Sequence, residues 1–190
     1  MLRVRDGRLY ARPDDVAGAS ARSWRDLLVE YNQTSSEENR FGLFPAWRLY
    51  SNPAYGDLVA ALGGDNVYVL SAGWGLIRSD FLTPQYDITF SAQAEPYKRR
   101  RRGDVYKDFC QLDRASGGQV LFLGGKDYVP LFCELTAGAK AQRIVFFGSE
   151  TPPRAPGCSL VKYPTTRRTN WHYACVNDFV AGRLSVPPER

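Results

Sequence analysis

The sequence lacks several features that would assign it to a class at once. No stretch approaches the roughly 20 consecutive apolar residues of a membrane-spanning helix, so we expect no integral membrane protein. The first residues have no apolar signal core, and we therefore expect a cytoplasmic rather than a secreted protein. Neither GxGxxG nor GxxxxGKS/T occurs, which leaves nucleotide hydrolysis by a P-loop unsupported. No internal repeat or low-complexity linker divides the 190 residues, so we expect a single domain.

Cysteine and histidine, the common ligands of transition metals, are scarce. The four cysteines, Cys110, Cys133, Cys158 and Cys175, form no CxxC pair, so a zinc ribbon or finger has no support. They could converge on an iron–sulfur cluster, but most of them lie in apolar runs, which favours buried, reduced thiols. We therefore predict no metal and no cofactor.

Positive charge is present in modest excess but is unevenly distributed. The formal net charge is +5, and 44% of the residues are hydrophobic, enough for a packed core. The basic residues that cluster along the chain are Lys98, Arg99, Arg100, Arg101 and Arg102, followed later by Arg167 and Arg168. Such clusters are typical of a surface that binds a polyanion, although a solvated loop explains a charge run equally well. We expect DNA, contacted through its phosphates, as the partner, with no membrane and no obligatory protein partner.

Hydrophobic patterning predicts an α/β fold. Short apolar runs at residues 67–70, 119–125 and 143–148 predict buried strands, and residues 159–163 predict a further one. The segments expected to be helical are 23–31 (capped by Ser23), 53–62, 104–112, 127–137 and 170–184. This order indicates a single three-layer domain over residues 1–190, with a mostly parallel central sheet and an irregular or helical extension at 1–45. In such sheets ligands bind beyond the carboxyl ends of the strands.

The segment after the first strand carries the most informative chemistry. Between residues 71 and 87 it contains the side chains Ser71, Trp74, Gln85, Tyr86 and Asp87. An aromatic plate, an amide and a carboxylate are the groups needed to stack and hydrogen-bond an extruded nucleobase. Ordinary loop packing explains Trp74 and Tyr86 equally well, and Asp87 could be a turn or cap residue.

The same segment resembles a known protein family. Residues 70–77 (LSAGWGLI) and 84–87 (PQYD) are similar to the "SAxxGLL…PYD" signature of the YaaA-like superfamily, with Gln85 as an added residue, and residues 46–55 resemble the segment before it. The resemblance implies a core like that of uracil-DNA glycosylases and, in some members, DNA binding. An anti-phage glycosylase that excises glucosylated hydroxymethylcytosine is placed in the same neighbourhood.

Together these observations predict a DNA glycosylase that excises a modified or damaged base by hydrolysing its N-glycosidic bond, in phage defence if the resemblance extends that far. The oxocarbenium-like transition state needs an anion, for which we choose Asp87, and a donor to the departing base, for which we choose His172. Asn170 completes the predicted base pocket of Ser71, Trp74, Gln85 and Tyr86. The clustered lysine and arginines would hold the backbone on both sides of the flipped base. A lone histidine is, however, often structural.

Two other functions fit the sequence. One is a DNA-binding stress protein of the YaaA kind without catalysis, and the other is an enzyme that modifies a nucleoside or a tRNA base. Phosphate-driven binding without turnover would indicate the first. A preference for folded RNA over duplex DNA would indicate the second.

Overall fold

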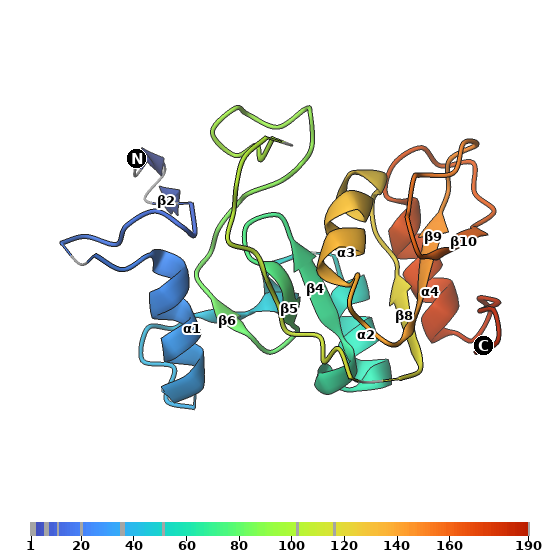
Figure 1. Ribbon diagram of the computed structural model, residues 1–190, viewed down its shortest axis with the longest axis horizontal. Coiled ribbons are helices and arrows are strands. Elements are labelled where there is room, and N and C mark those ends of the chain that lie inside the picture. Colours follow the sequence, from blue (N-terminus) through green and yellow to red (C-terminus); the bar gives the residue numbers. More distant parts are fainter. Residues whose placement is uncertain are drawn as a thin grey trace.

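The computed structural model has an α/β fold, with the N-terminal part of the chain at one end and the C-terminal part at the other (Figure 1). It describes residues 3–5, 8–10, 12–19, 21–34, 37–50, 52–101, 103–115 and 117–189. The predicted α/β class is therefore confirmed, whereas the single domain with an extension at 1–45 stays a prediction. Arg102, one of the predicted DNA-binding residues, lies outside the described residues.

Helices form at most of the expected places. The α-helices of the described residues are α1 (Trp24–Thr34), α2 (Ala54–Leu62), α3 (Val129–Leu135) and α4 (Trp171–Val180), and the 3-10 helices are η1 (Ala46–Leu49), η2 (Gly64–Asn66) and η3 (Lys126–Tyr128). Ser23 caps α1 as predicted, because its hydroxyl accepts from the Asp26 N–H at 3.1 Å and the Asp26 carboxylate accepts from the Ser23 N–H at 3.2 Å. No helix in the described part of the chain is long and apolar enough to cross a membrane.

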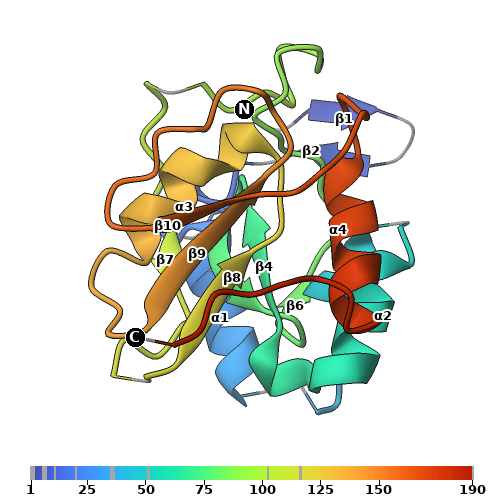
Figure 2. The same ribbon diagram turned by 90° about the vertical axis from the view of Figure 1, so that its right-hand side faces the viewer.

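Strands β8 (Gln119–Phe122), β9 (Gln142–Phe147) and β10 (Ser159–Lys162) form a parallel sheet in the order β10-β9-β8. Side chains alternate along β9: Val145 packs against α3, while Ile144 and Phe146 pack against Trp171 and Cys175 of α4. The helices α3 and α4 therefore cover opposite faces, and this part of the molecule has the expected three layers (Figure 2).

The first predicted strand forms but joins a different sheet. Strand β4 (Tyr68–Ser71) pairs antiparallel with β5 (Gly75–Arg78), and β5 pairs in parallel with β7 (Phe109–Cys110). The prediction of one mostly parallel central sheet containing this strand is wrong, because residues 72–74 form a tight turn that returns the chain along β4. A parallel neighbour would need a long crossover.

Two further antiparallel pairs complete the described strands: β1 (Arg3–Arg5) with β2 (Arg8–Tyr10), and β3 (Phe44–Pro45) with β6 (Leu82–Thr83).

The helix predicted at residues 104–112 is absent, since this segment is extended and ends in β7. Its backbone groups find partners elsewhere in the molecule. The Lys107 N–H donates to the Asp14 carboxylate at 2.8 Å, the Phe109 N–H to the Trp74 carbonyl at 3.3 Å, and the Gln111 N–H to the Leu76 carbonyl at 2.8 Å. These long-range bonds replace the intrahelical ones.

Candidate functional site

The turn between β4 and β5, which carries the motif residues, is held from inside by two buried arginines. Arg25 donates to the Gly73 carbonyl at 2.8 Å and to the Trp74 carbonyl at 2.9 Å. Arg100 donates to the Ala72 carbonyl at 2.9 Å. Because three successive carbonyls face charged donors, the turn is fixed in one conformation.

Ser71 links this turn to Tyr86. Its hydroxyl accepts from the N–H groups of Gly73 (3.1 Å) and Trp74 (3.0 Å) and lies 2.6 Å from the Tyr86 hydroxyl. With both lone pairs engaged, the Ser71 hydroxyl donates its proton to Tyr86. The Tyr86 hydroxyl in turn lies 3.5 Å from that of Tyr50.

Five tyrosines gather beside Ser71, and we call them the tyrosine cluster: Tyr50, Tyr55, Tyr86, Tyr128 and Tyr173. The rings of Tyr50 and Tyr55 stack with centroids 4.6 Å apart, and Tyr55 meets Tyr173 edge-on at 6.2 Å. Tyr128 lies within hydrogen-bonding distance of Thr89, with their hydroxyls 3.4 Å apart. All five are partly buried, so the cluster presents aromatic faces and hydroxyls at the edge of the core.

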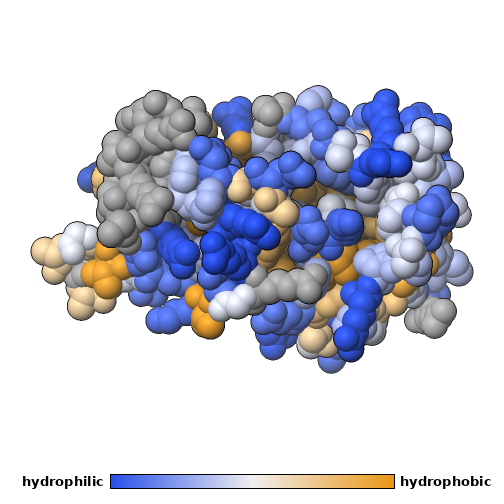
Figure 3. Space-filling view, turned by 90° about the horizontal axis from the view of Figure 1, so that it is seen from above, coloured by the Kyte–Doolittle hydropathy of each residue, from blue (hydrophilic) through white to orange (hydrophobic). Residues whose placement is uncertain are grey.

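The tyrosine cluster lies where the predicted fold would place a ligand. Ser71 ends β4, Tyr128 follows the carboxyl end of β8, and Tyr55 and Tyr173 stand in the first turns of α2 and α4. This side is the upper one in Figure 1. Seen from above, hydrophilic side chains cover most of the face, with hydrophobic ones showing between them (Figure 3).

Burial keeps four hydroxyls of the cluster protonated, those of Tyr50, Tyr55, Tyr86 and Tyr128. It raises the pKa of Tyr50 well above the ordinary value of 10.0, and the neighbouring Tyr86 raises it further. The pKa values of Tyr55, Tyr86 and Tyr128 are raised by burial as well. These residues are therefore neutral phenols that can donate hydrogen bonds at physiological pH.

The structure brings His172 to the same cluster. Its ring centroid lies 4.2 Å from that of Tyr173, on α4. Burial lowers the pKa of His172, so the imidazole is neutral at pH 7 and offers one N–H but no charge to a phosphate. Asn170, the residue before α4, is exposed and has a positive φ of 57°, a conformation that asparagine tolerates.

The other residues of the predicted base pocket differ in exposure. Trp74 is only 2% exposed and meets the Tyr86 ring edge-on at 6.0 Å, so it is a core residue rather than an accessible stacking plate. Ser71 is fully buried. Gln85 and Asp87 are exposed on the surface. The predicted pocket is therefore corrected: Trp74 and Ser71 support the site from beneath it.

Asp87, the predicted catalytic carboxylate, forms an ion pair. Its Oδ2 lies 2.7 Å from Lys98 Nζ, and its side chain is 51% exposed. Lys98 also lies 3.4 Å from Glu95. The ion pair therefore joins the predicted catalytic carboxylate, Asp87, to a predicted DNA-binding residue, Lys98.

The described part of the basic run, residues 98–101, does not form one surface. Arg100 is buried, forms a two-pronged ion pair with Asp108 and lies over the Tyr106 ring at 4.2 Å. Its expected role in DNA binding is wrong, because a guanidinium held in this way cannot reach a phosphate. Arg99 is half-buried, and Arg101 is exposed.

Arg167 and Arg168 are both exposed, between β10 and α4. They stand before the same helix that carries His172 and Tyr173. The second predicted basic site therefore lies on the loop that leads into α4, a few residues before Tyr173 of the tyrosine cluster.

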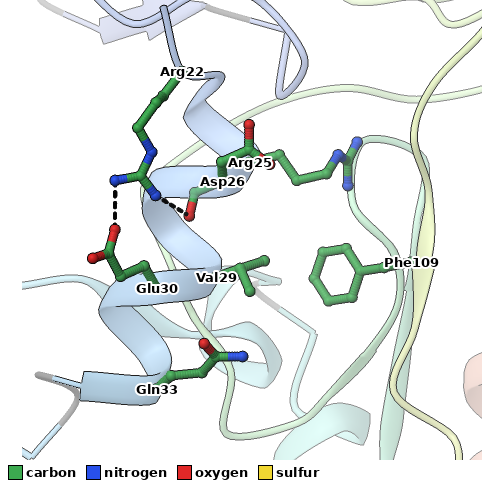
Figure 4. A pocket seen from close by; sticks show the side chains of 7 residues that line it. All are labelled: Arg22, Arg25, Asp26, Val29, Glu30, Gln33 and Phe109. Atoms are coloured by element: carbon green, nitrogen blue, oxygen red, sulfur yellow. Dashed lines mark hydrogen bonds and ion pairs between the residues drawn. The ribbon is translucent and has the colours of Figure 1, made fainter. Parts of the chain in front are cut away.

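A separate shallow groove lies between α1 and β7 (Figure 4). Its lining comprises Arg22, Arg25, Asp26, Val29, Glu30, Gln33 and Phe109. On the α1 side of the groove Arg22 forms an ion pair with Glu30, with 2.6 Å between Nη1 and Oε2. None of the predicted site residues lines this groove.

Within the described residues, no three histidine, cysteine or acidic side chains come together as a metal site would require. The four cysteines are free: Cys133 and Cys175 are buried, and Cys110 and Cys158 are partly so.

The sequence comparison assigns the chain to a family. The described residues form an α/β fold with a polar, aromatic cluster at the carboxyl ends of strands β4 and β8. A family of unknown function (DUF6884) matches residues 35–147, and the chain belongs to it. This match spans the turn, Tyr86 and Tyr128, while α4 lies beyond it. No curated protein and no solved structure matches the chain.

Four members of the tyrosine cluster were not predicted: Tyr50, Tyr55, Tyr128 and Tyr173. Tyr55 and Tyr173 stand in the first turns of α2 and α4, Tyr128 immediately precedes α3, and Tyr50 follows η1. The recurrence of tyrosine at the start of a helix is a signal that could have found Tyr55, Tyr128 and Tyr173, but not Tyr50.

Proposed function

We propose that this protein is a DNA glycosylase that excises a modified or damaged base, with a core related to that of uracil-DNA glycosylases. The observation that supports it best is the tyrosine cluster, which joins Tyr86 of the motif segment to His172 at the ligand-binding end of the strands. Aromatic faces with neutral hydroxyl donors suit a flipped base, which must be stacked and read along its polar edge.

The roles within the site follow from the state of each group. The neutral His172 imidazole would donate its N–H to the departing base as negative charge develops there. Asp87 would supply the anion beneath the sugar carbon once Lys98 is drawn away. A DNA phosphate is a natural competitor for that lysine, so binding would release the carboxylate when substrate arrives.

Backbone contact would come from the exposed cations. Arg101, Arg167 and Arg168 have the exposure that phosphate contacts require, with Lys98 joining after its exchange. Such a protein would act on DNA inside the cell. A phage genome with glucosylated hydroxymethylcytosine is the substrate that we would test first.

The test is base release. The full chain is incubated with a panel of DNAs carrying modified or damaged bases, and mass spectrometry detects the free base while a separate assay counts abasic sites. We expect Asp87→Asn to reduce the rate by about 100-fold or more while DNA binding is retained. Glu134→Gln, an exposed carboxylate on α3, is the matched control and should retain full activity. No released base from any DNA would refute the proposal.

One observation favours DNA binding without catalysis as a second candidate. Asp87 is half-exposed and paired with Lys98, as in many surface ion pairs, rather than desolvated in a pocket. This function predicts salt-dependent binding, no turnover, and tighter rather than weaker binding in Asp87→Asn. Preference for folded RNA in competition would instead indicate a tRNA- or nucleoside-modifying enzyme.

A further inference from the structure

Two of the four cysteines lie in contact with each other. Cys133 belongs to α3, and Cys158 lies just before β10 on the segment that follows β9. Their sulfur atoms are 3.7 Å apart, and both are free thiols. The two residues are far apart in the sequence, so the fold itself brings them together.

The backbone on both sides of the thiol pair is fixed by one side chain. Arg143 of β9 donates to the Cys133 carbonyl at 3.3 Å. Its guanidinium also packs against Gly157, where a Cβ would lie only 2.2 Å from Arg143 Nη2 and where φ is +70°. Since Gly157 precedes Cys158, the arrangement of the two sulfurs is set by the local packing.

We propose that Cys133 and Cys158 form a reversible intramolecular disulfide when the protein meets a peroxide. A disulfide needs a sulfur–sulfur distance of about 2.05 Å, so each sulfur has to move by only about 0.8 Å. Rotations about the Cα–Cβ bonds supply movements of this size without rebuilding α3 or the strand.

The chemistry balances in two steps. The thiolate of Cys158 attacks one oxygen of the peroxide, which gives a sulfenic acid and releases hydroxide or alkoxide. The Cys133 sulfur then attacks the Cys158 sulfur, loses its proton, and displaces the sulfenic oxygen as water. The peroxide receives the two electrons that the two thiols lose.

The exposures of the two residues assign these roles. Cys158 is partly exposed and can meet an oxidant, whereas Cys133 is only 5% exposed. Burial raises the pKa of Cys133, and the neighbouring Cys158 raises it further, so Cys133 is protonated and is not the thiol that reacts first with the peroxide. Cys110 and Cys175 have no such partner among the sulfur contacts of the described residues.

Oxidation would tie α3 to the β9–β10 connection. Tyr128, a member of the tyrosine cluster, is the residue that immediately precedes α3. Closing this link should raise the Tm of the protein by roughly 4–16 °C, because it restricts the unfolded chain. The inference does not depend on the proposed glycosylase activity.

The test uses the full chain and hydrogen peroxide as the only oxidant. After treatment the protein is unfolded, its free thiols are alkylated, and peptide mapping by mass spectrometry locates any link. We expect loss of two of the four free thiols, a mass decrease of about 2 Da, and a Cys133–Cys158 linked peptide that dithiothreitol separates. Cys158→Ser should abolish the link, and the matched Cys110→Ser should retain it.

Several outcomes would overturn the proposal. They are sulfinic acid at Cys158 with Cys133 still free, a disulfide between two chains only, or a link through Cys110 or Cys175. Cys133→Ala offers a second variant in which a small apolar residue fills the buried position. The wild-type peptide map decides the matter even if that variant fails to fold.

Discussion

The two arginines at positions 100 and 101 are neighbours in one basic run, and the structure predicts opposite consequences of replacing them. Arg100→Met removes a buried guanidinium that contacts the Asp108 carboxylate and the Ala72 carbonyl. Arg101→Met removes an exposed charge. The first change should destabilise the fold, whereas the second should weaken DNA binding without changing stability.

The magnitude follows from burial. The side chains of Arg100 and Asp108 are 9% and 7% exposed, so removing the cation leaves an uncompensated buried carboxylate. Breaking a buried pair in this way costs about 3–5 kcal/mol, which for a chain of this size lowers Tm by roughly 6–20 °C. Replacing both partners by apolar residues, as in Arg100→Met with Asp108→Leu, should recover much of this loss.

Urea unfolding followed by tryptophan fluorescence measures the free energy of unfolding of the wild type and of each variant. Arg101→Met should stay within about 0.5 kcal/mol of the wild type. If Arg100→Met is equally stable, the buried ion pair does not hold the β4–β5 turn. If instead Arg100→Met alone abolishes DNA binding while stability is unchanged, the interpretation of the basic run given above is wrong.

Three further predictions concern the backbone, the histidine and the basic loop. Gly75→Ala should cost at least about 2 kcal/mol in urea unfolding, because φ is +98° and a Cβ would lie 2.2 Å from the Phe109 carbonyl oxygen. Since burial lowers the pKa of His172 below its ordinary value of 6.5, the unfolded chain binds that proton first. The stability gained from a neutral His172 is complete above about pH 6.5 and is lost as pH falls, so His172→Gln should flatten the decline between pH 7 and pH 5. If the protein binds DNA, the double variant Arg167→Gln with Arg168→Gln should lower the slope of log Kd against log salt concentration by about 2.

Each of these has its own control. Gly63→Ala, at a φ of +79° with open space around it, separates backbone strain from the close approach at Gly75, and equal losses in both would contradict the packing argument. An unchanged pH profile in His172→Gln would mean that its imidazole titrates alike in both states. An unchanged salt slope would place the phosphate contacts away from Arg167 and Arg168.

Local pattern was enough to predict most helices and the strands of the parallel sheet. The apolar runs that became β8 and β9 are buried by helices on both faces, and such strands are recognisable because hydrophobicity is continuous. Ser23 could be assigned as a cap because its partner, Asp26, is three residues away. In each of these cases the deciding contacts are close in the sequence or repeat with a regular period.

The rest depended on contacts between distant residues. β7 exists because Phe109 and Gln111 bond to Trp74 and Leu76, and no propensity within residues 104–112 reports those partners. A run of five cations does not reveal that Arg100 turns inward while Arg101 stays in solvent. In an extended segment successive side chains face opposite ways. Asp108, the carboxylate that pairs with Arg100, is eight residues further along at an irregular spacing that no helix or strand period predicts.

The parallel pairing of β5 with β7 has a consequence for how this family can vary. Between the two strands the chain first contributes Phe81, Leu82 and Thr83 to the buried scaffold. It then forms a surface loop at residues 91–97, whose base is closed by backbone hydrogen bonds of Thr89 with Lys98 and Arg100. Doubling the length of a flexible loop costs only about 0.6 kcal/mol in closure entropy. Lengthening the surface loop at residues 91–97 should therefore leave the scaffold beneath it folded, which gives this family a separate region in which to vary.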